Sequence, residues 1–265
     1  MIPKTWENPV KTALREGKPV VGMTITAASV EVAAQAAQLG FDFLWIEMEH
    51  SPITLETLRN IVLATRGLNA VPFARVPVVE TWTAKRVLDM GVLGVVFPFA
   101  STPELVKLAA DACRYPPLGN RGHGSGLAMF RWPTEEPYPD FADRNVVTVT
   151  MIEDYRAVER IDEIAATPGV DVLFIGTSDL SFSMGLRGKQ DEPELQKMIE
   201  KVAQAARKHG KYAGRPAFNS AWIPKLLEQG FQFFQVPSET KMMSEGAQPY
   251  LQAFGKTGKA TKANY

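Results

Sequence analysis

The chain has 265 residues, and 45% of them are hydrophobic, so it can bury a large core without disulfides or structural metals. The 29 basic residues balance 29 acidic ones, which excludes a basic surface for nucleic acid or anionic lipid. The single cysteine, Cys113, excludes an internal disulfide, and there is neither a membrane-length apolar segment nor a signal-like start, which predicts a cytoplasmic protein that is not membrane-bound.

Eight short apolar segments alternate with amphipathic segments along the chain. The apolar segments lack regular polar alternation, which is typical of parallel strands covered on both faces. They span residues 20–25, 41–49, 71–76, 92–99, 146–153, 170–176, 212–216 and 231–236. Eight strands alternating with helices predict one α/β domain over residues 1–265, a closed (β/α)8 TIM barrel.

The segments between the strands carry helix-end signals. Thr54 and Thr102 are typical N-cap residues. The expected helices include residues 9–16, which would cover the barrel floor, and residues 55–65, 194–209 and 238–254. Residues 115–143 form too long a connection, rich in Pro and Gly, which favours a role in function or in subunit contacts. The polar tail, 256–265, is expected to be disordered.

Polar side chains follow most of the predicted strands at their carboxyl ends, where the reaction site of such a barrel lies. They are Glu47, Glu49, His50, Arg75, Glu153, Asp154, Ser178, Asp179, Arg215, Ser238 and Glu239. So many carboxylates, together with a histidine and an arginine at successive strand ends, predict an active site.

Glu153 and Asp179 follow neighbouring strands at equivalent heights. Two carboxylates completed by water and a chelating 2-oxo acid suit Mg²⁺ or Mn²⁺, which would hold the negative charge that forms on the keto oxygen. Arg75 would add a second positive group at that oxygen. The turn from Gly176 to Asp179 offers amides to the substrate carboxylate, and His50 is a suitable proton carrier.

Structural interpretations stand beside these functional ones. A strand-end carboxylate can cap the next helix, and Arg75 can be an ion-pair partner of Glu47 or Glu49. His50 can pack as a loop histidine on Trp45. No lysine lies at a strand end and no phosphate-binding loop follows the last strands, so a metal and a non-phosphorylated substrate fit better than a Schiff base.

Four motifs resemble the HpcH/HpaI aldolase family, and the likeness runs from about residue 8 to residue 254. They are Trp-Ile-Glu-Met-Glu-His-Ser-Pro at 45–52, Arg-Tyr-Pro-Pro-Leu-Gly at 114–119 with Arg-Gly at 121–122, Met-Ile-Glu at 151–153, and Phe-Ile-Gly-Thr-Ser-Asp-Leu-Ser at 174–181. The likeness is greatest to the family's class II pyruvate aldolases.

The resemblance implies a role for each matching residue. Glu153 and Asp179 would bind a divalent Mg²⁺, Mn²⁺ or Co²⁺ ion with no organic cofactor, and His50 would serve acid–base catalysis through water. Arg75 would steady the keto or enolate oxygen. The amides of Ser178 and Asp179, which follow Gly176, would hold the carboxylate.

The family also pairs its histidine with an aspartate, which matches Asp89 here. Asp89 ends the helix before the fourth strand, so it lies at the floor of its own barrel and would have to reach His50 of a neighbouring subunit. The resemblance therefore implies a homo-oligomer, a hexamer built as a trimer of dimers. Its dimers would exchange the C-terminal helix, residues 238–254.

The chain departs from the family pattern at its substrate contacts. Glu47 replaces an aspartate, Met48 a frequent glycine and Met151 a frequent glutamine. His123 stands at an often apolar position, where it would compensate for these changes or contact the aldehyde.

The expected reaction is reversible cleavage of a 4-hydroxy-2-oxo acid to an aldehyde and pyruvate, or a hydroxypyruvate-like donor, through a metal-bound enolate. Three alternatives remain open from the sequence. They are a citrate-lyase-like acyl-CoA lyase, an oxaloacetate decarboxylase, and a barrel that binds a keto acid without turnover.

Overall fold

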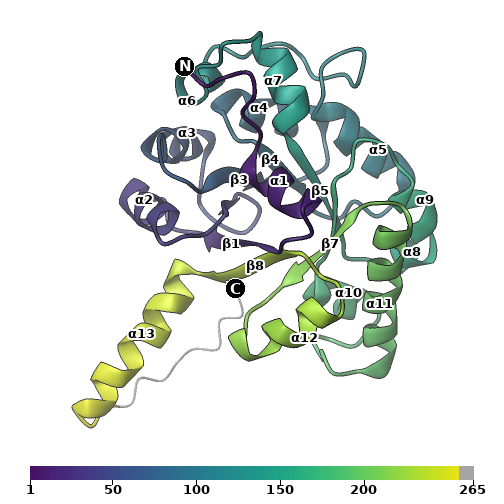
Figure 1. Ribbon diagram of the computed structural model, residues 1–265. Helices are drawn as coiled ribbons and strands as arrows, with labels where there is room; N and C mark the ends of the chain where they lie inside the picture. The colour runs from purple at the N-terminus through teal and green to yellow at the C-terminus, as the bar shows by residue number, and fades with distance from the viewer. Residues whose placement is uncertain (257–265) are drawn as a thin grey trace.

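The computed structural model describes residues 1–256 and confirms the (β/α)8 barrel. Eight parallel strands close in chain order, with the last strand pairing with the first (Figure 1). The strands are β1 Val20–Ile25, β2 Phe43–Glu47, β3 Val71–Arg75, β4 Gly94–Phe97, β5 Val147–Ile152, β6 Val172–Ile175, β7 Tyr212–Pro216 and β8 Phe233–Ser238.

All eight predicted strands are present, and their ends differ from prediction by no more than two residues. Differences of two residues occur at β2, β4, β6 and β8: the apolar segments are longer than the hydrogen-bonded strands at β2, β4 and β6, and β8 is shifted by two residues. Val92 and Leu93 are fully buried although they precede β4. Residues next to a strand can therefore be buried without belonging to it, so an apolar pattern alone overestimates strand length.

Helices surround the barrel and join its strands. They are α1 Pro9–Arg15, α2 Val30–Gln38, α3 Leu55–Ala64, α4 Thr81–Met90, α5 Pro103–Ala112, α6 Ala128–Arg131, α7 Tyr138–Asn145, α8 Tyr155–Glu159, α9 Ile161–Ala165, α10 Thr177–Ser183, α11 Pro193–Lys208, α12 Ile223–Glu228 with the 3₁₀ turn η1 Ser220–Trp222 before it, and α13 Glu239–Ala253. Thr54 and Thr102 are N-caps, as predicted, and each accepts a 3.3 Å hydrogen bond from a first-turn amide.

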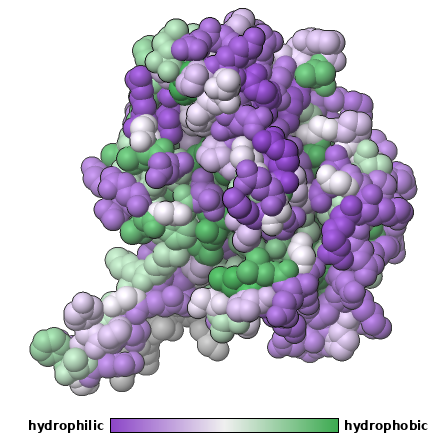
Figure 2. Space-filling model, in the orientation of Figure 1, coloured by the Kyte–Doolittle hydropathy of each residue, from purple (hydrophilic) through white to green (hydrophobic). Residues whose placement is uncertain are grey.

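The two ends of the chain lie on different parts of the barrel. Helix α1 covers the amino end, where Lys11 lies 3.4 Å from Asp171, just before β6. Helix α13 projects away from the barrel, with hydrophobic residues at its tip (Figures 1 and 2), and Met243, Tyr250 and Phe254 are 69%, 75% and 80% exposed. The tail predicted to be disordered lies, from residue 257 onward, outside the described residues.

The long connection 115–143 carries two short helices, α6 and α7, rather than an extended loop. Trp132 and Phe141 of this segment pack near each other, 6.1 Å between ring centroids, and both are buried. Within residues 1–256 no helix combines the length and hydropathy needed to span a bilayer.

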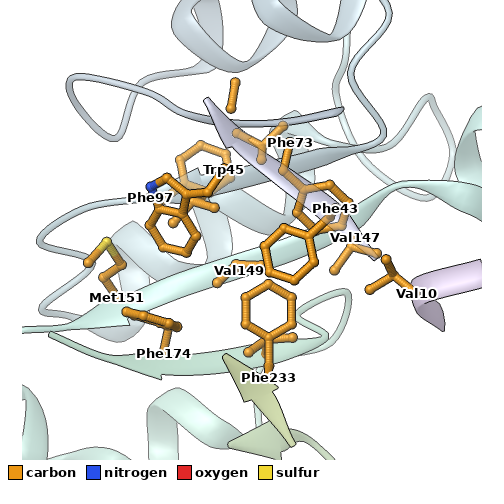
Figure 3. Close-up of a cluster of buried hydrophobic side chains, with 14 of the residues drawn as sticks. Val10, Phe43, Trp45, Phe73, Phe97, Val147, Val149, Met151, Phe174 and Phe233 are labelled. Carbon is orange, nitrogen blue, oxygen red and sulfur yellow. The ribbon is translucent and has the colours of Figure 1, made fainter. Parts of the chain in front are cut away.

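Aromatic rings fill the barrel interior (Figure 3). The Phe43 and Phe233 rings stack at 4.5 Å across β1, where Gly22 leaves room for them. A Cβ on Gly22 would overlap the Phe43 ring, and a Cβ on Gly94 would overlap the Phe73 ring. This layer closes the interior below the carboxyl ends of the strands.

The glycines also establish which side chains face inward, because side chains alternate along a strand. Gly214 lies against Phe174 and Phe233, so the next residue, Arg215, points outward. The expectation that β7 delivers Arg215 to the strand-end site is therefore wrong. Its guanidinium instead lies 5.4 Å from the Phe231 ring, and burial lowers its pKa.

Candidate active site

Glu47, the last residue of β2, connects three parts of the strand-end site. Its Oε2 lies 2.6 Å from both Nε and Nη2 of Arg75. Its Oε1 accepts the backbone N–H groups of Glu49 and His50 at 2.8 and 3.0 Å. Both side chains of the Glu47–Arg75 pair are nearly buried, so one carboxylate fixes the guanidinium and the turn that carries the histidine.

Glu49 continues this arrangement on the solvent side. Its Oε2 lies 3.1 Å from Nη1 of Arg75 and 3.5 Å from Nε2 of His50. Burial raises the pKa of Glu49, and the charges of Glu47 and Asp179 raise it further, against the opposing effect of Arg75 and His50. The ion-pair interpretation of Arg75 thus describes its contacts correctly, and the same contacts hold the guanidinium in place.

Glu153 follows β5 and lies in the barrel interior with 2% of its surface exposed. Its Oε2 accepts the backbone N–H of Phe99 at 2.8 Å, and Phe99 adopts a left-handed backbone with φ of 48°. Its Oε1 lies against Gly176, where any Cβ would overlap it. Gly176 therefore serves close packing of the carboxylate, and the contact joins two of the sequence motifs, 151–153 and 174–181.

The pKa of Glu153 is raised to about 7, mainly by burial and also by the negative charges of Asp179 and Glu49. Arg75 acts in the opposite direction, and its own pKa is raised by Glu47 and Glu49 although burial opposes that shift. Glu49, Glu153, Asp179 and Arg75 therefore interact at one end of the barrel. With Glu47, four neighbouring carboxylates lie around one guanidinium, an arrangement that favours an additional cation.

Asp179 is partly buried in the first turn of α10. The first hydrogen bond of that helix runs from Leu180 N–H to Gly176 O, so the amides of Thr177, Ser178 and Asp179 precede the helical ladder. Gly176 provides no side-chain cap. These amides lie next to the carboxylate of Glu153, which packs against Gly176.

The residues fit a divalent cation held by two protein carboxylates. Among residues 1–256 no group of three or more His, Cys, Asp or Glu side chains is arranged to hold a metal ion. Mg²⁺ commonly binds through one or two carboxylates and completes its shell with water and substrate oxygens. Glu153 and Asp179 match that donor set, and a cation would offset the burial and the carboxylate repulsion that raise the pKa of Glu153.

Asp89 and His123 lie together in a different part of the chain's own fold. Asp89 is the ninth residue of α4, about 12 Å along the helix from its start near the carboxyl end of β3. Its Oδ1 lies 3.0 Å from Nη2 of Arg121, and burial raises the pKa of Asp89 against the opposing effects of Arg121 and, more weakly, of His123. The His123 ring lies 5.9 Å from that of Tyr115.

Two other strand-end acids have structural contacts. Asp154 caps α8 by accepting the backbone N–H of Arg156 at 2.8 Å, and it also forms an ion pair with that side chain. Glu239, at the start of α13, accepts hydrogen bonds from Thr26 and Ala27 after β1. The capping interpretation therefore applies to Asp154, whereas Glu239 ties the segment after β1 to the start of α13 without capping a helix. Phe99 is the site contact to which the sequence assigned no role, and Glu49 was considered there only as an ion-pair partner of Arg75.

Comparison with known proteins places this chain among aldolases. A family model described as HpcH/HpaI aldolase/citrate lyase matches residues 21–246. A hydroxypyruvate/pyruvate aldolase of Agrobacterium fabrum is 36% identical over 88% of each chain. A 2-keto-3-deoxy-L-rhamnonate aldolase of Salmonella gallinarum is 33% identical over 93% of each.

A solved structure of an HpcH/HpaI aldolase/citrate lyase family protein from Burkholderia cenocepacia is also similar. It is 30% identical, with a TM-score of 0.86, over 94% of this chain and all of the other. The barrel, its strand-end site and these relatives define a carbon–carbon lyase of the aldolase type. The chain belongs to the HpcH/HpaI aldolase/citrate lyase family.

Proposed function

We propose that this aldolase reversibly cleaves 4-hydroxy-2-oxo acids to an aldehyde and either pyruvate or a hydroxypyruvate-like 2-oxo acid. The observation that carries the proposal is the interaction of Arg75 with Glu49 and Glu153 beside Asp179. It combines a fixed positive group with a carboxylate pair suited to a cation. Such a site favours negative charge on a keto oxygen.

We assign Glu153 and Asp179 as ligands of Mg²⁺, Mn²⁺ or Co²⁺. When bound, the ion would supply Lewis acidity to the keto group of the 2-oxo acid. The amides that begin α10, at Ser178 and Asp179, hold the substrate carboxylate. This assignment leaves Arg75 to neutralise charge at the keto oxygen.

Arg75 acts without reorganisation because Glu47 and Glu49 already fix its guanidinium. His50 accepts the proton of the C4 hydroxyl, directly or through water, as the C3–C4 bond breaks. The products are an aldehyde and an enolate, and the enolate takes a proton at C3 to give the 2-oxo acid. Glu49, 3.5 Å from the His50 ring, stabilises the protonated imidazole between these steps.

Subunit assembly would complete the site. Asp89 is too far along α4 to orient His50 of its own barrel, so it would act in a partner subunit. His123 would accompany it and contact the aldehyde there. The exposed apolar residues of α13 support exchange of that helix within dimers, with three dimers forming a hexamer. A small-molecule substrate and one buried cysteine fit a cytoplasmic location.

Proton exchange tests the reaction class. The protein is stripped with EDTA and incubated with pyruvate in D₂O, with and without added Mn²⁺ or Mg²⁺, while the methyl proton signal is followed. Metal-dependent loss of that signal is the expected result, and Arg75→Lys should slow it. Absence of exchange with every metal would favour a thioester lyase or a barrel that only binds a keto acid.

A decarboxylase is separated from an aldolase by a second measurement. Oxaloacetate decarboxylation and aldol addition of pyruvate to an aldehyde are assayed with the same metal-loaded enzyme. Aldol addition should be the faster reaction at equal substrate concentration. Decarboxylation without any aldol product would contradict the proposal.

A further inference from the structure

A polar pair interrupts the apolar interior between β8 and β1. The side-chain amide nitrogen of Gln235 donates to the Thr24 hydroxyl at 2.9 Å, and that hydroxyl donates to the Val236 carbonyl at 2.8 Å. Both side chains are buried, with 5% of Thr24 and 8% of Gln235 exposed. The two residues are 211 positions apart, and closure of the barrel brings them together.

Both side chains point into the barrel. Thr24 lies two positions after Gly22, whose missing side chain makes room for the Phe43 ring, and Gln235 lies two positions after Phe233 of the aromatic layer. Alternation along a strand therefore directs Thr24 and Gln235 inward. They are closer to the carboxyl ends of their strands than the aromatic rings are.

This position faces the proposed reaction site. In a (β/α)8 barrel, inward side chains of alternate strands form shared layers. Thr24, Arg75 and Met151 are the uppermost inward residues of β1, β3 and β5, and Nη1 of Arg75 lies 3.9 Å from the Met151 sulfur. The Thr24–Gln235 pair thus forms the wall of the same space on the β1 and β8 side.

The pair has hydrogen-bonding capacity that the protein leaves unused. Because the Thr24 proton is directed to the Val236 carbonyl, the group facing Thr24 must be the amide nitrogen of Gln235, and Oε1 points elsewhere. Within residues 1–256 this Oε1 has no hydrogen-bond partner, and it is not sealed from solvent. One acceptor and one remaining N–H match an alcohol, which both donates and accepts.

We propose that Gln235, oriented by Thr24, recognises a hydroxyl group of the substrate. The inference rests on the proposed function. The hydroxyl belongs either to C3 of a hydroxylated 2-oxo acid donor or to the aldehyde, and both present the same alcohol chemistry. If the pair had only a packing role, replacing Thr24 by Val and Gln235 by Met would leave substrate choice unchanged, because the new side chains fill a similar volume.

Isosteric variants test this role. Gln235→Met removes the hydrogen-bonding groups at similar length, and Thr24→Val removes the anchor. Thr150→Val is the matched control, since its buried hydroxyl has no partner in the described chain and faces away from the interior on β5. Values of kcat/KM are measured for pyruvate and for hydroxypyruvate, each with acetaldehyde and with glycolaldehyde.

The Gln235→Met enzyme should lose about tenfold more kcat/KM with the recognised hydroxylated substrate than with its counterpart that lacks the hydroxyl. Selective loss with hydroxypyruvate assigns the donor, and selective loss with glycolaldehyde assigns the aldehyde. Thr24→Val should lose less, in the same direction, and Thr150→Val should behave as wild type. Equal losses in all four reactions would overturn the inference and leave the aldolase intact.

A binding measurement separates this inference from the proposed reaction. Calorimetry with Mg²⁺ gives the ratio of dissociation constants for hydroxypyruvate and pyruvate, and likewise for the two aldehydes, without requiring turnover. Suppose that the wild-type protein lacks aldol activity and that Gln235→Met nevertheless changes the ratio of dissociation constants. This result would overturn the proposed reaction but support the recognition site. Unchanged ratios would overturn the recognition site whether or not the protein is active.

Discussion

The two carboxylate oxygens of Glu47 hold different parts of the site: Oε2 binds Arg75 at 2.6 Å, while Oε1 binds the backbone of the turn that leads into His50. The side chain on which charge stabilisation depends and the residue assigned to proton transfer therefore share one anchor. Replacing that anchor should disturb both at once.

Glu47→Gln should lower the free energy of unfolding by about 3 kcal/mol, because it leaves the nearly buried Arg75 without its closest counter-charge. It should also reduce kcat more than it raises KM. Urea unfolding and steady-state kinetics measure the two effects. Glu56→Gln, on the exposed face of α3, is the control, and equal stability of the two variants would contradict the prediction.

Gly176→Ala should displace the Glu153 carboxylate, since the added Cβ would overlap Oε1. We expect at least about tenfold weaker divalent-metal binding, measured by calorimetry on a protein whose circular dichroism is unchanged. Gly126→Ala adds the same methyl group where nothing lies within 4 Å and should bind metal as wild type does. Metal binding of wild-type strength in Gly176→Ala would rule out Glu153 as a ligand.

Glu153 should make the metal-free protein less stable as the pH rises. Its pKa is about 7 in the fold against an ordinary 4.5, so the stability that this group contributes is complete below about pH 4.5 and is lost as the pH passes 7. Between about pH 5 and pH 8 the free energy of unfolding should fall by about 3 kcal/mol more in wild type than in Glu153→Gln. If urea unfolding at each pH gave parallel stability profiles for wild type and Glu153→Gln, the prediction would be contradicted.

Subunits with complementary defects should restore activity if Asp89 acts across an interface. Asp89→Asn and His50→Ala chains, each inactive alone, are mixed, partly unfolded and allowed to reassemble. Random assembly gives one site in four an intact His50 and an intact partner, so about one quarter of the wild-type activity is expected. No recovery, with mixed oligomers proven by mass spectrometry, would place both residues in one subunit or assign Asp89 no role.

Helix α13 should control assembly. Met243→Glu combined with Tyr250→Glu changes residues that are 69% and 75% exposed in the single chain, so the isolated barrel should remain folded. Sedimentation should nevertheless show a smaller species than wild type. Leu39→Glu, at the C-cap of α2 where the apolar side chain is 61% exposed, should leave the sedimentation unchanged. Identical profiles for both variants would exclude α13 from the interface.

The sequence predicted the barrel because eight apolar segments and their caps follow from local pattern. It also placed Glu47, Arg75 and Glu153 at strand ends. The prediction for Arg215 was wrong because successive side chains of a strand point alternately into and out of the barrel. The contacts of Gly214 with Phe174 and Phe233 show that position 214 points inward, so Arg215 points outward. A shift of one residue reverses the face of a strand residue, and an apolar segment does not locate its ends that well.

Contacts between distant residues were also beyond the sequence. The Thr24–Gln235 hydrogen bond exists only because β8 returns to β1, and neither residue belongs to a recognisable motif. The Phe99 amide that binds Glu153 depends on a left-handed backbone at a residue that seldom adopts one. Such contacts depend on closure of the sheet and on loop conformation, which single-chain patterns do not encode.

The packed rings of Phe43, Phe73, Phe174 and Phe233 leave the barrel with no passage through its centre. A molecule that reacts at Arg75 must then arrive and depart on the same side. When one substrate splits into two fragments, the one lodged deeper is trapped until the outer one has diffused out. The packing of four phenylalanines thereby imposes an ordered release of the two products, which product-inhibition kinetics can detect.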